Sequence, residues 1–167
     1  TYTQSGNYYD FLQLGADIDG EEEYDESGRS VSLSSDGMTV AIGANGNDGN
    51  GWGSGHVRIY SWDGLSWNQQ GADIDGEAGY DFSGSSVSLS SDGKTVAIGA
   101  YRNDGNGLDA GHVRIYSWDG LSWNQLGADI DGEAAGDYSG YSVSLSSDGM
   151  TVAIGAFGND GNSQDVG

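Results

Sequence analysis

The chain has 167 residues, of which 5 are Lys or Arg and 26 are Asp or Glu, giving a formal net charge of −21. This charge repels nucleic acid phosphates and anionic lipid surfaces, so we expect neither a nucleic acid partner nor membrane insertion. Gly accounts for 31 residues while Pro and Cys are absent, which excludes collagen, Pro-rich linkers, disulfides and thiolate metal sites. The apolar alternation and 11% aromatic residues indicate a folded protein.

An internal repeat dominates the sequence. The heptapeptide Gly-Ala-Asp-Ile-Asp-Gly-Glu begins at Gly15, Gly71 and Gly127, a spacing of 56 residues with no insertion between copies. We therefore expect a single repeat domain in four parts. Residues 1–14 are the degenerate second half of a repeat, 15–70 and 71–126 are repeats 1 and 2, and 127–167 are an incomplete repeat 3.

The expected strands form hairpins in chain order. Thr1–Ser5 and Phe11–Leu14 are in phase with the third and fourth strands of later repeats. In repeat 1, residues 30–34 and 38–44 form a hairpin around Asp36-Gly37. Residues 56–62 and the return from Leu65 to Ile74 form a second hairpin around Asp63-Gly64. Both Asp-Gly pairs predict two-residue type I′ turns, in which both turn residues have positive φ.

The alternation within the strands predicts a buried apolar face. That face comprises Val31, Leu33, Val40, Ile42, Val57 and Ile59. Ala41 and Gly43 lie on the opposite side of their strand, where small residues allow a neighbouring sheet to approach closely.

The repeat length and strand pattern define the expected fold class. No helical period of 3.6 residues occurs, so the class is all-β. Four antiparallel strands per 56-residue repeat predict β-propeller-like blades, with three blades' worth in this chain. A stacked β-solenoid is the alternative, although its rungs are shorter and do not need Asp-Gly hairpins.

Part of each repeat resembles a known family. Residues 82–101, and similarly 138–157 and 26–45, resemble the FG-GAP repeat of integrin α-subunit propellers, and 111–116 look like the glycine-led third strand. Two departures stand out. No Pro follows the Gly-Ala pair, and Ser90-Ser91-Asp92-Gly93 replaces the family's acidic calcium loop. The resemblance implies an extracellular recognition or adhesion module.

The phase of the repeat predicts assembly. The chain opens with the second half of a blade and closes with the first half, and three blades are fewer than the four to eight of a closed propeller. We expect residues 1–18 of one copy to complete the hairpin 142–156 of another, giving a filament; a closed ring and a segment of a longer array are the alternatives. The predicted interface residues are Thr1, Tyr2, Thr3, Phe11, Leu12, Leu14, Val143, Leu145, Val152 and Ile154.

Alternating carboxylates predict a calcium site in each repeat, because Ca²⁺ takes six to eight oxygen ligands. The candidate ligands are Asp17, Asp19, Glu21, Asp25, Asp73, Asp75, Glu77, Asp81, Asp129, Asp131, Glu133 and Asp137. The alternative is a solvated acidic connection between blades.

Three further patterns have structural interpretations. The Asn-Asp-Gly loops at 47–51, 103–107 and 159–162 are typical of Asx turns, with a cation or sugar contact as the alternative. Trp62, Trp67, Trp118 and Trp123 flank the Asp63-Gly64 turn and its repeat and indicate either blade packing or stacking on a sugar. His56 and His112 start equivalent third strands, where pairing with carboxylates or a strand-edge hydrogen bond is expected, because no nucleophile accompanies them.

Together these patterns favour a non-enzymatic, structural or adhesive protein. We expect it outside the cell or on its surface, with other copies of itself as partner. The alternative is a calcium-dependent adhesin or lectin-like module that binds a glycan or a surface protein.

Overall fold

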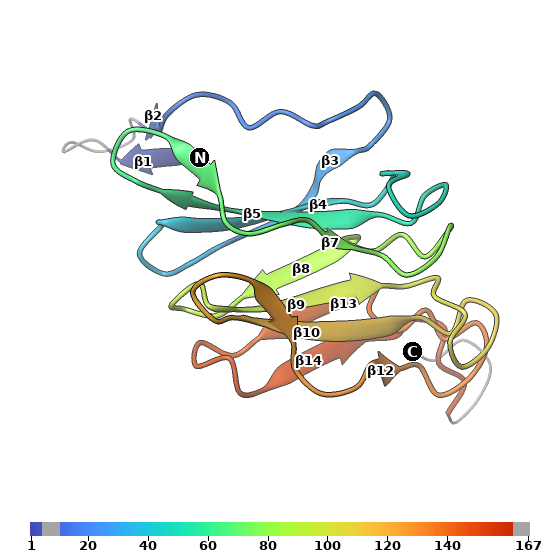
Figure 1. The fold of residues 1–167 in the computed structure, drawn as a ribbon. Helices are drawn as coiled ribbons and strands as arrows, with labels where there is room; N and C mark the ends of the chain where they lie inside the picture. The colour runs from blue at the N-terminus through green and yellow to red at the C-terminus, as the bar shows by residue number, and fades with distance from the viewer. Residues whose placement is uncertain (5–10, 162–167) are drawn as a thin grey trace.

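The computed structural model describes residues 1–4 and 11–161 (Figure 1). Ser5, at the end of the first expected strand, and Asn162, at the end of the third Asn-rich loop, lie outside the described residues. The regular elements that the structure describes are all strands, which confirms the all-β class. No helix in this part of the chain is long and apolar enough to cross a membrane.

The strands fall into two complete blades between two half-blades. The first half-blade contains β1 (Tyr2–Gln4) and β2 (Phe11–Gln13). Blade 1 contains β3 (Ser27–Leu33), β4 (Thr39–Ala44), β5 (His56–Trp62), β6 (Trp67–Gln69) and β7 (Ile74–Asp75). Blade 2 contains β8 (Ser86–Leu89), β9 (Thr95–Ala100), β10 (His112–Trp118), β11 (Trp123–Gln125) and β12 (Ile130–Asp131). Blade 3 is represented by β13 (Ser142–Leu145) and β14 (Val152–Gly155).

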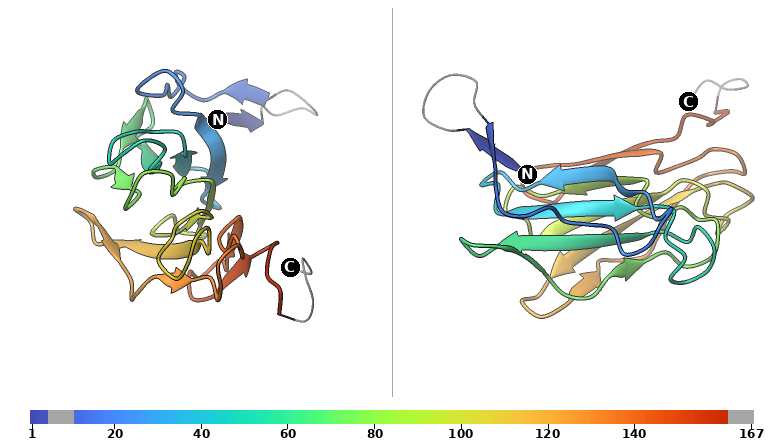
Figure 2. Two further views of the ribbon diagram at one scale, coloured as in Figure 1. Left: turned by 90° about the vertical axis from the view of Figure 1, so that its right-hand side faces the viewer. Right: turned by 90° about the horizontal axis from the view of Figure 1, so that it is seen from above.

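Each complete blade is an antiparallel sheet in sequence order. The strand orders are β3-β4-β5-β6 and β8-β9-β10-β11, with β7 and β12 pairing beside the first residues of β5 and β10. The inner strands β3, β8 and β13 lie next to one another. Figure 2 shows the blades fanning out from these inner strands in an arc that remains open between the N-terminal half-blade and blade 3. This arrangement is that of β-propeller blades.

The hairpin turns differ from the expected type I′. Among the described residues of the two expected turns, Gly37 and Gly64 have positive φ, but Asp36 and Asp63 do not. The loops are longer than two residues, and the aspartates accept hydrogen bonds across them. Asp36 Oδ1 accepts from the Ser34 hydroxyl at 2.6 Å, and Asp63 Oδ1 accepts from the backbone N–H of Leu65 at 2.7 Å. The type I′ prediction was therefore wrong, although the hairpins were correct.

Each blade has apolar residues on both faces, not on one. Cross-strand register pairs Ala41 with Ile59 and Gly43 with Val57, which places Val57 and Ile59 opposite the face that contains Val40 and Ile42. The expected single face was therefore wrong. A blade instead has a large-residue face, with Val31, Leu33, Val40 and Ile42, and a small-residue face, with Ser30, Ser32, Ala41 and Gly43.

The small-residue face of one blade packs against the large-residue face of the next. Ala41, Val57 and Ile59 of blade 1 form a core cluster with Val87, Leu89, Val96 and Ile98 of blade 2. A Cβ atom on Gly43 would collide with the carbonyl oxygen of Gly84, and one on Gly99 with that of Gly140. The close approach expected at Ala41 and Gly43 is thus confirmed.

Two side-chain hydrogen bonds fix this packing, and both recur after one repeat. The hydroxyls of Ser30 and Ser86 donate to the carbonyl oxygens of Gly84 and Gly140, each at 2.7 Å. The backbone N–H groups of Leu89 and Leu145 donate to the hydroxyl oxygens of Ser32 and Ser88, each at 2.9 Å. Serine at these positions therefore sets the register between neighbouring blades.

Candidate functional site

The connections between blades contain most of the carboxylates, and one aspartate of each connection is buried. Asp25, Asp81 and Asp137 are 5%, 4% and 2% exposed. Asn47 Nδ2 donates to Asp25 Oδ2 at 3.1 Å, and Asn103 Nδ2 donates to Asp81 Oδ2 at 2.9 Å. The same aspartates accept backbone N–H bonds from Glu22 and Ala78, both at 3.1 Å. These contacts tie the acidic connection to the Asn-rich loop of the following blade.

A histidine in blade 2 lies among carboxylates from both flanking connections. His112 Nδ1 is 3.7 Å from Asp129 Oδ2, 3.9 Å from Glu77 Oε2 and 3.9 Å from Asp131 Oδ1. The short pairing of β12 with β10, with Asp131 opposite His112, brings these groups together. We call Glu77, His112 and Asp129 the blade 2 cluster.

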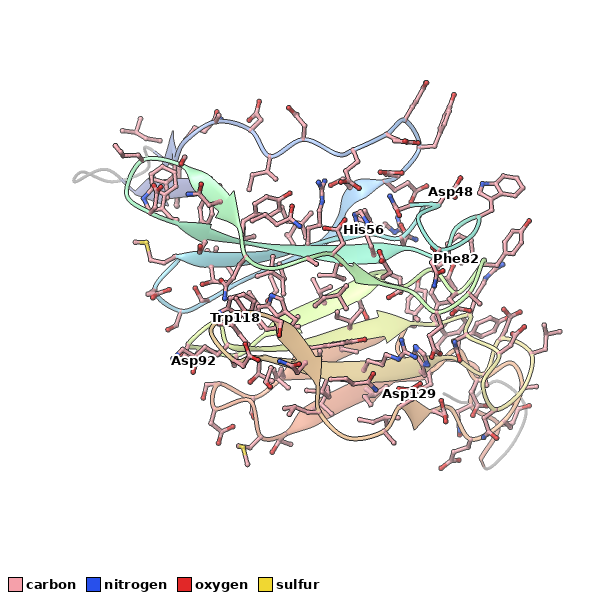
Figure 3. The ribbon with its side chains drawn as sticks, in the orientation of Figure 1. Asp48, His56, Phe82, Asp92, Trp118 and Asp129 are labelled. Atoms are coloured by element: carbon pink, nitrogen blue, oxygen red, sulfur yellow. The ribbon has the colours of Figure 1, made fainter. Side chains whose placement is uncertain are left out.

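The same arrangement occurs one repeat earlier. His56 Nδ1 is 3.7 Å from Asp73 Oδ2 and 4.0 Å from Glu21 Oε2. Glu21, His56 and Asp73 form the blade 1 cluster, and in both clusters the three potential ligand atoms lie within 4.8 Å of one another. The blade 1 cluster lines a hollow of about 490 Å³, together with Asp48 and Asp75. Figure 3 shows His56, Asp48 and Asp129.

An arginine accompanies each cluster. Arg114 forms ion pairs with Glu77 Oε1 and, at 3.0 Å, with Asp129 Oδ1, whereas Arg58 Nη1 is 3.4 Å from Glu21 Oε1. Burial opposes ionisation of Asp129, but hydrogen bonds from Arg114 and Gln125 outweigh it and place the pKa of Asp129 below its ordinary value. Burial lowers the pKa of His112, although nearby carboxylates partly offset this.

The carboxylates expected to bind calcium do not all come together. The two clusters contain Glu21, Asp73, Glu77 and Asp129, and each joins a residue of one connection to a residue of the next. Asp25, Asp81 and Asp137 are held by asparagines, and Asp17 Oδ1 accepts from Gln13 Nε2 at 2.9 Å. Asp19, Asp75, Asp131 and Glu133 are exposed. Calcium binding by the twelve residues stays a prediction.

Carboxylate pairing of the histidines was expected, but the partners were not identified from sequence. Glu21 and Asp73 are 52 positions apart, and only the two-residue pairing of β7 with β5 brings Asp73 to His56. The equal spacing of Glu, His and Asp in two repeats is the signal that could have revealed the clusters.

The Asn-rich loops are Asx turns, as expected. Asn47 Oδ1 accepts from the backbone N–H of Gly49 at 2.8 Å, and Asn103 Oδ1 accepts from that of Gly105 at 2.8 Å. Asn159 makes the equivalent bond to Gly161 at 3.0 Å. These amide oxygens therefore accept hydrogen bonds from the backbone of their own loops.

The four tryptophans are half-buried and pack against the chain that enters the repeat. Trp62 lies 5.4 Å from Trp67, and Trp118 lies 5.4 Å from Trp123, measured between ring centroids. Trp67 Nε1 donates to the Leu14 carbonyl oxygen at 2.9 Å, and Trp123 Nε1 donates to that of Gln70 at 2.8 Å. These bonds favour the packing interpretation over sugar stacking.

The two ends of the arc expose faces that are buried between blades. Val31 is 64% exposed and Leu33 49%, whereas their equivalents Val87 and Leu89 are 8% and 7% exposed. At the other end Ala153 is exposed, whereas Ala41 and Ala97 are fully buried. The edge of β14 away from β13 and the edge of β1 away from β2 have no strand partner among the described residues.

The predicted interface residues lie at these two ends. Phe11 and Leu12 are 64% and 58% exposed on β2, and Leu14 is half-buried. Thr1 is exposed, and the backbone of Tyr2 and Thr3 pairs with β2. Val143, Leu145, Val152 and Ile154 are half-buried on the β13–β14 hairpin.

Tandem antiparallel blades packed around inner strands define a β-propeller-type repeat protein. The FG-GAP repeat family matches residues 17–60 and 72–116, more than half of the chain. The chain therefore belongs to the FG-GAP repeat family, as the resemblance of residues 82–101 implied. A search of curated proteins found no significant match.

Proposed function

We propose that this chain is a non-enzymatic structural protein of the extracellular space or cell surface, whose copies join end to end by completing each other's blades. The observation that carries the proposal is the 56-residue series of contacts between blades. The Ser30 hydroxyl donates to the Gly84 carbonyl oxygen, and one repeat later the Ser86 hydroxyl donates to that of Gly140. The next hydrogen bond in this series would join Ser142 to Gly28 of a second copy. Gly28 has φ of 89°, close to the 81° of Gly84 and 83° of Gly140.

The open faces are complementary in size. Blade 3 ends in a small-residue face with Ser142, Ser144 and Ala153, and blade 1 begins with the large-residue face. Within the chain, contacts between blades always join these two kinds of face. A contact between unlike faces is heterologous, and such contacts build rings or filaments.

A hollow in front of blade 1 lies where we expect the hairpin of a second copy to pack. It has a volume of about 470 Å³ and is lined by Thr1, Ile18, Val31, Leu33 and Ile42, among others. Insertion of the β13–β14 hairpin of a second copy covers Val31 and Leu33 and brings β14 alongside the free edge of β1. The result is a four-stranded blade, β13-β14-β1-β2, shared by two copies, and strand addition of this kind is a common mode of association.

Two single substitutions, each blocking one face, test the proposal. Val31→Glu places a charge on the large-residue face, and Ala153→Glu places one on the small-residue face; both positions are exposed in the single chain, so each variant should fold. We expect the wild-type chain to form rings or filaments in electron micrographs, most readily at raised ionic strength, which screens the charge of −21. Each variant alone should be monomeric, and Met150→Glu, at a position 83% exposed in the turn, should assemble normally.

If the assembly is a filament, a mixture of the two variants gives the most specific test. Each retains one functional face, so an equimolar mixture should yield heterodimers of twice 17.3 kDa and nothing larger. If two copies instead close a six-bladed ring, the wild-type chain stops at the dimer. Deleting residues 1–14 should abolish assembly while leaving β-structure in circular dichroism. A wild-type chain that stays monomeric at high concentration in light scattering, or assembly that survives both face substitutions, contradicts the proposal.

A further inference from the structure

The residues of the two histidine clusters are not among those that the proposed assembly joins. We propose that Glu21, His56 and Asp73, and equivalently Glu77, His112 and Asp129, each bind one divalent transition-metal ion of the Zn²⁺ type. The two sites lie in blades 1 and 2 of a single chain, so the inference does not depend on end-to-end assembly.

The spacing of the ligand atoms fits a metal ion better than direct hydrogen bonds. The distances of 3.7–4.0 Å from the histidine Nδ1 atoms to the carboxylate oxygens are too long for hydrogen bonds. Tetrahedral Zn²⁺, with bonds of about 2.0–2.2 Å, places its ligand atoms roughly 3.4 Å apart. The three ligand atoms of each cluster lie within 4.8 Å of one another, so side-chain movements of up to about 1.4 Å complete the coordination.

The imidazole of His112 provides independent support. Its side chain is 4% exposed, and Nδ1 has no hydrogen-bond partner although it faces three carboxylates. A buried polar nitrogen without a partner is costly, and native proteins rarely leave one. A metal ion between Nδ1 and the carboxylates supplies the missing partner. In the blade 1 cluster the unpartnered nitrogen is Nε2 of His56, so that site is inferred from the equivalent spacing of its ligand atoms.

The charges around the clusters are suited to a cation. Each arginine contacts Oε1 of its glutamate, and Oε2 of the same carboxylate faces the histidine. The arginines thus hold the glutamates on the side away from the metal position, while Arg114 also donates to Asp129 Oδ2, which faces His112, at 3.1 Å. Asp131, whose Oδ1 is 3.9 Å from His112 Nδ1, offers a fourth ligand atom, and Asp75 lines the corresponding hollow in blade 1.

The donor set selects the kind of ion. Ca²⁺ and Mg²⁺ are bound by oxygen ligands, whereas imidazole nitrogen together with carboxylate oxygen suits Zn²⁺ and its neighbours in the first transition series. Glu77 precedes β8, the first strand of blade 2, and Asp129 lies between β11 and β12, so a bound ion joins both connections to the start of β10. The ion therefore acts as a structural clamp across each blade.

Titration of the full-length chain with Zn²⁺ in excess Ca²⁺ tests the proposal. After treatment with EDTA and buffer exchange, isothermal titration calorimetry should give two Zn²⁺ ions per chain, and Zn²⁺ should raise the unfolding temperature. His56→Asn and His112→Asn should each retain one site, and the double variant should retain none. Glu23→Gln, an exposed carboxylate outside both clusters in the same acidic stretch, should still bind two ions.

Nuclear magnetic resonance of the imidazole nitrogens provides a test on the unmodified chain, in case a histidine variant does not fold. Zn²⁺ should shift the Nδ1 resonances of His56 and His112, the only histidines in the sequence. Two Zn²⁺ ions retained by a folded double variant, unaltered Nδ1 resonances, or displacement of Zn²⁺ by equimolar Ca²⁺ overturns the proposal. Lack of saturable binding also overturns it and identifies the clusters as ion-pair networks only.

Discussion

The backbone N–H of Leu89 donates a hydrogen bond of 2.9 Å to the hydroxyl oxygen of Ser32, on the neighbouring blade and 57 positions earlier in the chain. Leu89 is 7% exposed, so no solvent replaces this bond if it is lost. The side chain of an ordinary strand serine thus satisfies a backbone donor of the next blade. Since Leu145 and Ser88 repeat the contact, this hydrogen bond is a regular part of the interface between neighbouring blades.

Ser32→Ala should destabilise the single chain by about 1–3 kcal/mol, because the Leu89 N–H then remains buried without an acceptor. Urea unfolding followed by circular dichroism measures the effect. Ser144→Ala is the matched control, since Ser144 is exposed at the end of the arc. It should change the free energy of unfolding of the monomer by less than about 0.5 kcal/mol. Equal losses of unfolding free energy from both substitutions would assign the effect to strand propensity and not to the hydrogen bond between blades.

Gly99→Ala should cost about 1–3 kcal/mol or more, since its Cβ collides with the Gly140 carbonyl oxygen on the next blade. Gly155 occupies the same place on blade 3, where the nearest atom to a new Cβ belongs to the adjustable hydroxyl of Ser142. Gly155→Ala should therefore leave the thermal unfolding of the monomer nearly unchanged but weaken end-to-end assembly. A loss of monomer stability equal to that of Gly99→Ala contradicts this explanation.

The blade architecture could be predicted from sequence because it depends on short-range signals. Alternation, Gly at the turns and an undisturbed 56-residue period define hairpins and their number. The faces could not be assigned as readily, because both faces of a propeller blade are buried. Ile59 and Ile42 are both apolar, and only the register that pairs Ala41 with Ile59 separates them.

The turn type and the histidine clusters required three-dimensional information. The Asp-Gly pair alone predicts a two-residue turn. In the structure Asp36 accepts hydrogen bonds from Ser34 and Met38 and so closes a longer loop. The clusters depend on contacts between residues 52 positions apart in sequence. Their ligands come from connections on both sides of a blade, which a search within one acidic stretch does not combine.

Asn103→Ala should destabilise the chain by about 1.5–3 kcal/mol, because Asn103 donates to the buried carboxylate of Asp81. The backbone N–H of Ala78 also donates to that carboxylate, at 3.1 Å. Asn124→Ala is the control, since Asn124 Nδ2 donates at 2.8 Å to Asp119 in an exposed turn. Its effect should be within about 0.5 kcal/mol in chemical denaturation. Similar effects of the two substitutions would refute the importance of the buried amide-carboxylate pair.

Acid should destabilise the hairpin turns between the first two strands of each blade. The Ser90 hydroxyl and the Lys94 backbone N–H donate to Asp92 Oδ1 at 2.7 and 3.0 Å, and these bonds lower the pKa of Asp92 below 3.8. Asp36 and Asp148 have lowered pKa values for the same reason. Since the unfolded chain binds protons more readily than the folded chain, stability is retained above about pH 4–5 and decreases as pH falls through the folded pKa values.

A triple variant with Asn in place of Asp36, Asp92 and Asp148 tests this interpretation. The amide oxygen of Asn can still accept from serine and from the backbone, but it does not titrate. We expect a reduced slope of unfolding free energy against pH below pH 4, with most stability retained at pH 7. The corresponding Ala variant loses the acceptors and should be less stable at pH 7 as well. If the Asn variant keeps the full wild-type slope, other carboxylates control acid unfolding and the turn aspartates do not contribute to it.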